Sequence, residues 1–156
     1  PLRKLATSIP VFYESLDEYK EASLVMHGVI ALKCNAFTTY EQTAKEMAKL
    51  DDQLKIHGEN SNGAGEIVMI IVCDDPAFTS AQLNNFLWVT FTRSNPSHDI
   101  YGVDASIENK HWGCKGPVIF DARIKPHHAP AVEKDPATEK SIEHIFNKGG
   151  SLYRKL

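Results

Sequence analysis

Apolar residues gather along this chain in short continuous runs that alternate with segments of helical spacing. The runs at residues 25–34 (VMHGVIALKC), 66–73 (EIVMIIVC) and 118–122 (VIFDA) have the length and the β-branched content of strands. The first two runs are apolar nearly throughout, as is typical of parallel strands buried on both faces. We therefore expect three strands in one sheet, with the run at 66–73 as a central parallel strand.

Between and after these runs, apolar residues recur at spacings of three and four, which places them on one face of a helix. Helix-capping residues or glycines lie at the ends of each such segment. Helices are expected from Thr38 or Thr39 to near Gly58, from Thr79 or Ser80 to before Pro96, and from Asp135 to about Phe146. The stretch 97–115 is predicted to be irregular or to hold one short strand. Strands and helices alternate along the chain, which indicates the α/β class.

The length of 156 residues fits one domain. We divide the chain into an N-terminal linker with a short helix at residues 1–24, an α/β domain at residues 25–147 and a tail at residues 148–156. The sequence begins without an initiator Met, a signal-peptide core or an Arg-rich transit pattern. That start is typical of a chain that begins within a longer protein, and tag removal or maturation would give the same start.

Charge and composition exclude several functional classes. The formal net charge is −3, and Lys and Arg are scattered rather than gathered in the basic stripe of a nucleic-acid-binding protein. The apolar runs are too short to span a bilayer. The three cysteines are too widely spaced to indicate a disulfide framework, and they favour a reducing, cytoplasmic location. Cys34 and Cys73 end apolar runs and are expected to be buried, whereas Cys114 lies in a Gly-flanked loop and is the reachable thiol.

Two adjacent carboxylates, Asp74 and Asp75, follow the second strand, at the sheet edge where open α/β proteins bind ligands. Such a pair can hold a hard cation, but an oxygen site needs more protein ligands. Before Pro76, Asp also serves as a turn former that bonds nearby backbone groups. A structural role is therefore favoured for both carboxylates, and no metal site is predicted.

The other polar residues give no complete catalytic or metal motif. His127 and His128 are adjacent in a loop bounded by prolines and lack the spacing of four that lets two imidazoles share one ion. A GxSxG nucleophile elbow is missing from the sequence. The Gly-rich stretch 58–66 follows a helix and precedes a strand, which is the wrong order for cradling phosphate at a helix N-terminus.

Two residues of the second predicted helix have structural interpretations. Trp88, in the helix interior, is expected in the core. Arg93, at the helix end, suits the helix dipole and is expected to pair with a carboxylate such as Asp99. His27 and His111 have no partner that the sequence identifies. None of these residues is assigned a catalytic role.

Several motifs follow one another in a definite order. In IVCDDPAFTSAQLNNFLWVTFTRSNPSHDI, an apolar strand ends in paired Asp, and a helix then carries LWA-like and TR motifs before a Pro and an Asp. GCKGPVIFDAR and the closing VEKDPATEKSIEHIF continue the series. The matching residues are Asp74, Asp75, Leu87, Trp88, Thr92, Arg93, Pro96, Asp99, Lys115, Gly116, Asp121 and Ala122. Over residues 25–147 the series resembles the C-terminal domain of UbiD-type decarboxylases and carboxylases, and within that family the phenylphosphate carboxylase-like branch.

The resemblance implies a three-layer α/β domain with a mixed, mainly parallel sheet flanked by helices. It implies a full enzyme that uses prenylated flavin mononucleotide (FMN), with a divalent metal and a monovalent cation, to decarboxylate an aromatic or α,β-unsaturated acid reversibly. The family's catalytic Arg and Glu and its metal ligands lie in preceding domains, and no residue of this chain matches them. A phosphate-contacting Lys of the family has its nearest match in Lys55. We therefore expect this chain alone to be inactive and to bind no cofactor.

Three functions are compatible with these observations. The first is a C-terminal domain that forms a wall of the cleft for the aromatic acid and carbon dioxide and supports homo-oligomerisation, together with the remaining N-terminal domains. The second is a small non-catalytic subunit that binds and completes a UbiD-like partner chain. The third is an unrelated ligand-binding α/β domain with its site at the Asp74 edge.

Overall fold

The computed structural model describes residues 4–58, 66–128 and 135–154, so the interior of the Gly-rich stretch lies outside the described residues. The chain forms two units, Pro1–Pro126 and His127–Leu156. The elements of the first unit are η1 (Val11–Ser15), β1 (Glu21–Met26), β2 (Val29–Lys33), α1 (Tyr40–Gly58), β3 (Met69–Cys73), α2 (Pro76–Ala81), α3 (Leu83–Thr92), β4 (Ile100–Gly102), β5 (Ala105–Glu108), β6 (His111–Cys114) and β7 (Val118–Asp121). The second unit contains α4 (Pro136–Phe146).

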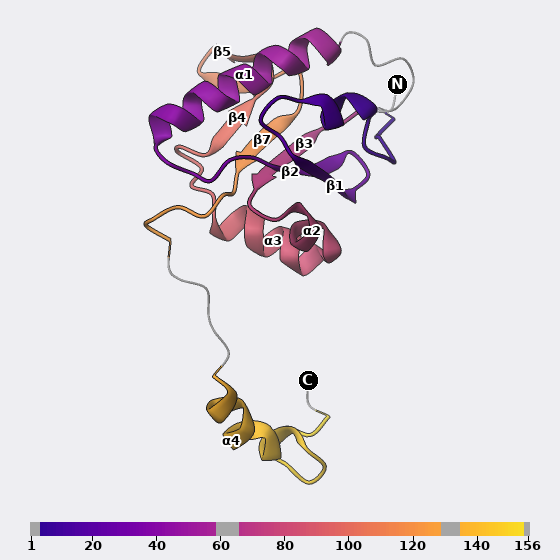
Figure 1. Ribbon diagram of the computed structural model, residues 1–156, viewed down its shortest axis with the longest axis vertical. Helices are drawn as coiled ribbons and strands as arrows, with labels where there is room; N and C mark the ends of the chain where they lie inside the picture. The colour runs from indigo at the N-terminus through magenta and orange to yellow at the C-terminus, as the bar shows by residue number, and fades with distance from the viewer. Residues whose placement is uncertain (1–3, 59–65, 129–134, 155–156) are drawn as a thin grey trace. The chain divides into compact units, whose positions relative to one another are not determined.

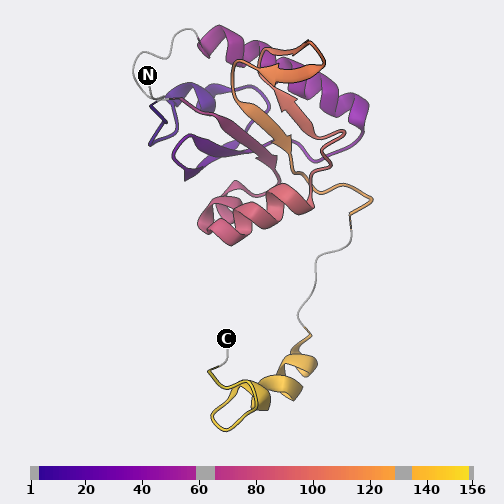
Figure 2. The same ribbon diagram turned by 180° about the vertical axis from the view of Figure 1, so that it is seen from behind.

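A mixed five-stranded sheet lies at the centre of the first unit (Figures 1 and 2). Its strand order is β1-β2-β3-β7-β4. β2, β3 and β7 run parallel to one another, whereas β1 and β4 pair antiparallel with their neighbours at the two edges. The α/β class and the mixed sheet flanked by helices are thus confirmed, with β3 as the central parallel strand. β5 and β6 form a separate hairpin.

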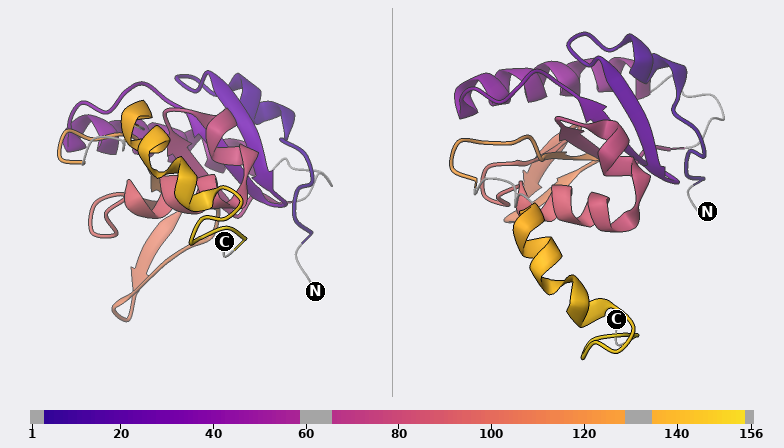
Figure 3. Two further views of the ribbon diagram at one scale, coloured as in Figure 1. Left: turned by 90° about the horizontal axis from the view of Figure 1, so that it is seen from below. Right: turned by 60° about the horizontal axis from the view of Figure 1, so that its bottom comes forward.

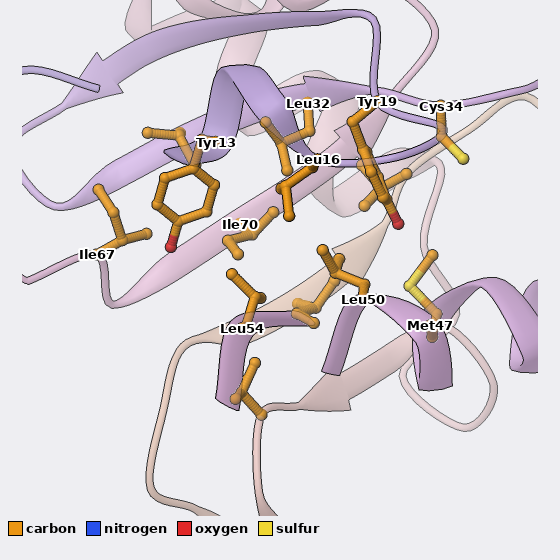
Figure 4. Close-up of a cluster of buried hydrophobic side chains, with 14 of the residues drawn as sticks. Tyr13, Leu16, Tyr19, Leu32, Cys34, Met47, Leu50, Leu54, Ile67 and Ile70 are labelled. Carbon is orange, nitrogen blue, oxygen red and sulfur yellow. The ribbon is translucent and has the colours of Figure 1, made fainter. Parts of the chain in front are cut away.

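The two faces of the sheet carry separate cores because successive side chains of a strand point to opposite faces. On one face, Met47, Leu50 and Leu54 of α1 pack with alternate residues of β2 and β3, such as Leu32 and Ile70 (Figure 4). On the other face, Phe86 and Val89 of α3 pack with Val29, Ala31, Ile71 and Cys73. The sheet is therefore the middle of three layers.

The segment around η1 belongs to the first of these cores. Tyr13, Leu16 and Tyr19 are buried against the sheet residues that also contact α1 (Figure 4). Burial raises the pKa of the Tyr13 and Tyr19 phenols above their ordinary value. Packing by these side chains explains how a segment with little regular structure is ordered. The division of the chain at residues 24 and 147 stays a prediction.

The single strand predicted over residues 25–34 is wrong, because the chain forms a hairpin there. β1 and β2 pair antiparallel, and His27 and Gly28 make the turn between them. Gly28 has a φ of +75°, and a Cβ at this position would lie 3.0 Å from Leu5 Cδ2 and 3.2 Å from the carbonyl oxygen of Glu66. Only glycine adopts this conformation without strain. The apolar run conceals the turn, since Gly28 is its one local signal.

The single helix predicted from Thr79 or Ser80 to before Pro96 is also wrong, because the chain forms two helices there, α2 and α3. α2 begins one residue after Asp75, whose Oδ1 accepts a hydrogen bond from the Phe78 N–H at 2.8 Å. Thr79 is buried inside α2 and donates its hydroxyl to the Asp75 carbonyl. Gln82 is extended and separates α2 from α3. The predicted cap is therefore wrong, and Asp75 is the N-cap.

Residues 97–115 contain three short strands rather than at most one. β4 extends the edge of the sheet, and β5 and β6 add the separate hairpin. The strand at β7 and the helices α1 and α4 are confirmed. Asp135 caps α4 as expected, because its carboxylate accepts hydrogen bonds from the N–H groups of Ala137 and Thr138 at 3.1 and 3.2 Å. Along the described ranges, no helix is long and apolar enough to cross a membrane.

Candidate functional site at the carboxyl edge of the sheet

The parallel strands β2, β3 and β7 end at the same edge of the sheet, where open α/β folds place their ligands. Three polar residues follow the strand ends: Asn35 after β2, Asp74 after β3 and Asp121 at the end of β7. Asp121 is also one of five charged side chains at this edge that we call the carboxyl-edge cluster. Its members are Glu46, Asp99, Asp121, Arg123 and Lys125, and all are buried.

Arg123 is the centre of this cluster. Its Nε and one terminal nitrogen form a bidentate contact with the Asp121 carboxylate at 2.8 and 3.0 Å. The other terminal nitrogen donates to Glu46 Oε2 at 2.8 Å and to the Asn35 carbonyl at 2.9 Å. The remaining N–H reaches Thr43 Oγ1 at 2.9 Å. Each of the five guanidinium N–H groups therefore has an acceptor inside the molecule.

The charge of Arg123 is stabilised although the side chain is only 1% exposed. Burial by itself opposes a cation, but hydrogen bonds to Asp121 and Glu46 and the charge of Asp121 outweigh it and raise the pKa of Arg123 above its ordinary value. Asp121 and Glu46 are buried as well, so each charge of this group has an opposite charge beside it. Arg123 thereby joins the end of β7 to α1 and to the loop after β2.

Lys125 makes a second set of contacts two residues further along the chain. Its Nζ donates to the carbonyls of Asp121 at 2.8 Å and Arg93 at 3.3 Å. It also lies 3.3 Å from Asp99 Oδ1, an ion pair without hydrogen-bond geometry. The other carboxylate oxygen of Asp99 accepts from the Asn95 N–H at 2.6 Å. Lys125 thus joins β7 to the end of α3 and to the segment that enters β4.

The paired carboxylates after β3 bond backbone groups, as expected of turn formers. Asp75 caps α2, and Asp74 Oδ2 accepts a hydrogen bond from the Ile124 N–H at 2.8 Å. Asp74 also lies 3.6 Å from Arg93 Nη1. Arg93 thus pairs with a carboxylate, as predicted, but the carboxylate is Asp74 rather than Asp99.

The expectation that Trp88 lies in the core is wrong. Trp88 is 43% exposed, and the Arg93 guanidinium lies 4.7 Å from the centre of its ring. Trp88 also packs edge-on against Phe78 of α2. The cation–π contact and the ion pair to Asp74 hold the partly buried Arg93 side chain at the end of α3.

Aromatic rings lie beside the carboxyl-edge cluster, because the centre of the Phe37 ring is 5.9 Å from Arg123 Cζ and 5.5 Å from Lys125 Nζ. Tyr40 contacts Phe37 and His98, with ring centres 5.2 Å apart in both pairs. Ser97 Oγ lies 2.6 Å from His98 Nδ1 and 2.8 Å from Asn95 Oδ1. Ser97 thereby connects Asn95 with His98. Burial and the charges of Asp99 and Asp121 raise the pKa of Tyr40.

The arrangement as a whole is suited to holding segments together. The donors of Arg123 are used internally, and the buried carboxylates are paired with cations or backbone groups. A catalytic acid or nucleophile needs a group that faces the substrate, which the cluster does not present. Among the described residues, no three His, Cys, Asp or Glu side chains form a group that could hold a metal ion.

Sequence reasoning missed this cluster, although one local signal points to it. Asp121, Arg123 and Lys125 occupy alternate positions after a buried strand, so an extended chain presents them on one side. The partner Glu46 is 77 residues from Arg123 in the sequence. Its position on the buried face of α1 is not recognisable from helical spacing of apolar residues alone.

Lys55, the predicted phosphate contact, pairs with a residue outside the cluster. Lys55, on the exposed side of α1, forms an ion pair with Asp51 at 2.6 Å, and the hydrogen bond to Asp51 and the charges of Asp51, Asp104 and Asp52 raise its pKa. A cofactor phosphate at Lys55 would therefore compete with Asp51. The role of Lys55 stays a prediction.

The histidines and cysteines that the sequence singled out lie on different parts of the structure. His127 and His128 contact each other edge-on in the second unit, and His111 begins β6. Cys34 and Cys73 are buried as expected, and Cys114 is partly exposed. Burial raises the pKa of all three thiols, that of Cys73 to about 11.

Comparison with known proteins gives partial matches. No family model matches the chain. Over 79 residues, 51% of the chain, the sequence is 31% identical to 14% of a Chlamydia pneumoniae protein that is named as one of the subunits of 4-hydroxybenzoate decarboxylase. An uncharacterised protein of Chlamydia muridarum is 31% identical over 80 residues, again 14% of its length. The matched stretch thus spans about one seventh of these relatives, and over it the resemblance to decarboxylases is confirmed.

Two solved structures also align with the chain. The vanillic acid decarboxylase of Sedimentibacter hydroxybenzoicus is 18% identical, with a TM-score of 0.44 over 83% of this chain and 29% of that one. An evolved dimeric form of the UbiD-class enzyme HmfF from Pelotomaculum thermopropionicum, in complex with prFMN, is 16% identical, with a TM-score of 0.46 over 79% of this chain and 24% of that one.

Proposed function

We propose that this chain is the C-terminal part of a UbiD-type carboxy-lyase that acts reversibly on an aromatic or α,β-unsaturated carboxylic acid. In this role it forms a wall of the cleft and contributes to oligomerisation, and the catalytic residues lie elsewhere in the enzyme. The sequence match to a decarboxylase polypeptide supports the family. The internally paired charges of the carboxyl-edge cluster support the non-catalytic role.

The observation that carries the proposal is the complete internal use of the Arg123 donors at the edge where ligands bind. An arginine that serves substrate carboxylates must present a free fork of N–H groups. Arg123 instead connects the end of β7 with α1 and with the loop after β2 through hydrogen bonds. The cluster therefore gives the cleft a rigid wall, and the chemistry requires groups from another part of the enzyme.

In the full enzyme, prenylated FMN with a divalent metal and a monovalent cation supplies the electron sink for carbon dioxide release. Lys55 of this chain contacts the cofactor phosphate. The isolated chain binds no cofactor. The three free thiols fit the reducing cytoplasm, where we place the enzyme.

The proposal is tested by assaying the isolated chain for carbon dioxide release from a panel of aromatic and α,β-unsaturated acids, with prenylated FMN, a divalent metal and a monovalent cation added. No turnover and no change in the flavin absorbance spectrum are expected. Far-UV circular dichroism establishes that the chain is folded, and an active enzyme of the family serves as the positive control. Turnover by these 156 residues alone would overturn the proposal.

The role of Lys55 has a separate test in the full enzyme. Lys55→Met should weaken prenylated FMN binding, because a cation near the phosphate is lost. Lys45→Met is the matched control, since Lys45 lies on the same helix and also pairs with a carboxylate four residues away. Equal cofactor affinity of both variants would show that Lys55 is a surface lysine only.

A second candidate function is a small subunit that binds and completes a UbiD-like catalytic chain. The name of the Chlamydia pneumoniae relative, which describes one polypeptide of a multi-subunit enzyme, favours this alternative. Coexpression with a catalytic chain that lacks this region should then give a stable complex whose activity depends on both chains. Full activity of the catalytic chain alone would exclude this function.

A further inference from the structure

A groove of about 250 Å³ lies between α1 and the edge strand β4. The β5–β6 hairpin, which follows β4 in the chain, forms a third side through Ala105 and Trp112. Figure 3 (left) shows this hairpin projecting from the edge of the sheet. We call the space the α1–β4 groove. It is separate from the carboxyl-edge cluster, because none of the five charged side chains of that cluster is among the described residues that line it.

Small residues leave the room in the groove. Ala44 and Ala48 lie on successive turns of α1, and both are exposed. The indole of Trp112 lies against β4, since a Cβ at Gly102 would come within 3.0 Å of Trp112 Cζ2 and 2.6 Å of Cys114 Cβ. Glycine at position 102 therefore lets the indole approach this strand. The groove has one wall with only methyl side chains and another wall with a large aromatic ring.

The floor of the groove is apolar, and its volume limits the size of a ligand. Met47 of α1 and Ile119 of β7 line it and are no more than 3% exposed. Drug-sized ligands occupy pockets of about 300–1,000 Å³, whereas an apolar cavity of about 150 Å³ binds benzene. The α1–β4 groove lies between these sizes and fits one aromatic ring with a small substituent.

The free edge of β4 supplies polar groups to the groove. Tyr101 pairs with Ile119 of β7, and backbone bonds two residues to either side show that this is a hydrogen-bonded pair. The backbone N–H and C=O groups of Ile100 and Gly102 therefore point away from β7. All three β4 residues line the groove although successive side chains point to opposite faces, so the groove reaches this edge. The edge offers a ligand hydroxyl both N–H donors and C=O acceptors.

Charge determines which aromatic compounds fit. Asp51 is the one charged side chain among the described residues that line the groove. Its oxygens accept hydrogen bonds from the Asp104 N–H at 2.8 Å and from Lys55 Nζ at 2.6 Å. Burial raises the pKa of Tyr101 to about 12, so this ring stays uncharged. A ligand carboxylate would meet the Asp51 carboxylate without a cation in the lining, and a neutral ligand is therefore favoured.

We propose that the α1–β4 groove binds a neutral phenol of one ring, with the ring against Trp112 and the hydroxyl at the free edge of β4. Binding itself rests on the groove alone, and only its meaning in the enzyme rests on the proposed function. Decarboxylation of a hydroxylated aromatic acid takes up a proton, releases carbon dioxide and leaves the corresponding phenol. The groove would then hold the product and exclude the acid. Its test measures binding rather than carbon dioxide release, so each proposal can fail without the other.

The experiment is an NMR titration of the folded chain at pH 7 with phenol and, separately, with 4-hydroxybenzoate, which adds one carboxylate to the same ring. Trp88→Phe assigns the two indole N–H signals, because the chain has two tryptophans. Phenol should shift the Trp112 signal saturably and leave the Trp88 signal in place. 4-Hydroxybenzoate should bind at least about tenfold more weakly, because a like charge opposes it.

Filling the groove gives a second test. Ala48→Phe should weaken phenol binding at least about tenfold, because the new ring occupies the ligand's space. Ala77→Phe is the matched control, since Ala77 is exposed on α2, on the other side of the sheet (Figure 1), and should leave the affinity unchanged.

The wild-type titration keeps the proposal falsifiable if Ala48→Phe fails to fold. Phenol that shifts neither indole signal, or both alike, would overturn the proposal. Equal affinity for 4-hydroxybenzoate, or a folded Ala48→Phe variant with unchanged affinity for phenol, would also overturn it.

Discussion

Arg123 has its guanidinium in contact with two buried carboxylates, a hydroxyl and a backbone carbonyl. A buried ion pair contributes little compared with a well-packed apolar group, but the loss of one partner leaves a charge buried without compensation. In the carboxyl-edge cluster, the loss of Arg123 would leave Glu46 in that state and would leave Asp121 with only the ion pair to Lys125 Nζ at 3.8 Å. The stability of the edge therefore depends on this one side chain.

We predict that Arg123→Met lowers the free energy of unfolding by about 3–5 kcal/mol, the cost of leaving buried charges unpaired. Urea denaturation measures the change. Lys45→Met removes the exposed contact between Lys45 and Glu41 and should change the stability by no more than about 0.5 kcal/mol. Equal effects of the two substitutions would show that the cluster does not hold the edge together.

The thiols differ in accessibility, and this difference predicts their reactivity. Burial raises the pKa of Cys73 to about 11 and also raises that of Cys34, so both are protonated and shielded at mildly alkaline pH. Cys114 is partly exposed. Mass spectrometry after alkylation of the native chain should find Cys114 modified first, and the other two only after unfolding. Equally fast labelling of Cys73 would contradict the buried position.

At the scale of elements, turns and caps decide where strands and helices end. Gly28→Ala should destabilise the protein by about 1–2 kcal/mol, because an L-residue at positive φ is strained. Gly113→Ala is the control, since a Cβ at Gly113 would meet nothing within 4 Å. Thermal denaturation of both variants compares them. A loss as large for Gly113→Ala would mean that the φ at Gly28 is not the cause.

The cap of α4 makes that helix sensitive to acid. Hydrogen bonds from Thr138 and Ala137 lower the pKa of Asp135 in the folded state. The capping contribution is therefore complete above the ordinary Asp pKa of about 3.9 and is lost as the pH falls through the lowered folded value. NMR chemical shifts of Ala137 and Thr138 should follow this titration. Asp135→Asn, a cap that does not titrate, should make the shifts independent of pH, and a persisting titration would contradict the assignment.

The elements show which features a sequence reveals. β3, β7, α1 and α4 were predictable because length, apolar spacing and local caps such as Asp135 act within a few residues. The β1–β2 hairpin was missed because its apolar residues continue through the turn. The carboxyl-edge cluster was missed because Arg123 meets Glu46 only after the chain has crossed the sheet. Trp88 was misplaced because apolar spacing alone does not show whether a side chain faces the core or the solvent.

For the whole molecule, the first unit combines a cluster of paired charges at the sheet edge with an uncharged apolar face on α2 and α3. The first is suited to a rigid wall, and the second carries apolar side chains that the first unit leaves exposed. Neither presents a free catalytic group. Together with a sequence match that spans 14% of a decarboxylase polypeptide, they favour a structural role within a larger enzyme.

The intact mass of the natural polypeptide that contains this sequence is the decisive quantity for that role. Mass spectrometry of the native gene product should give a mass several times the 17.4 kDa of these 156 residues, with further domains that carry the catalytic Arg and Glu. A native polypeptide of 17.4 kDa would contradict a role as one part of a longer chain and leave the small-subunit function in its place.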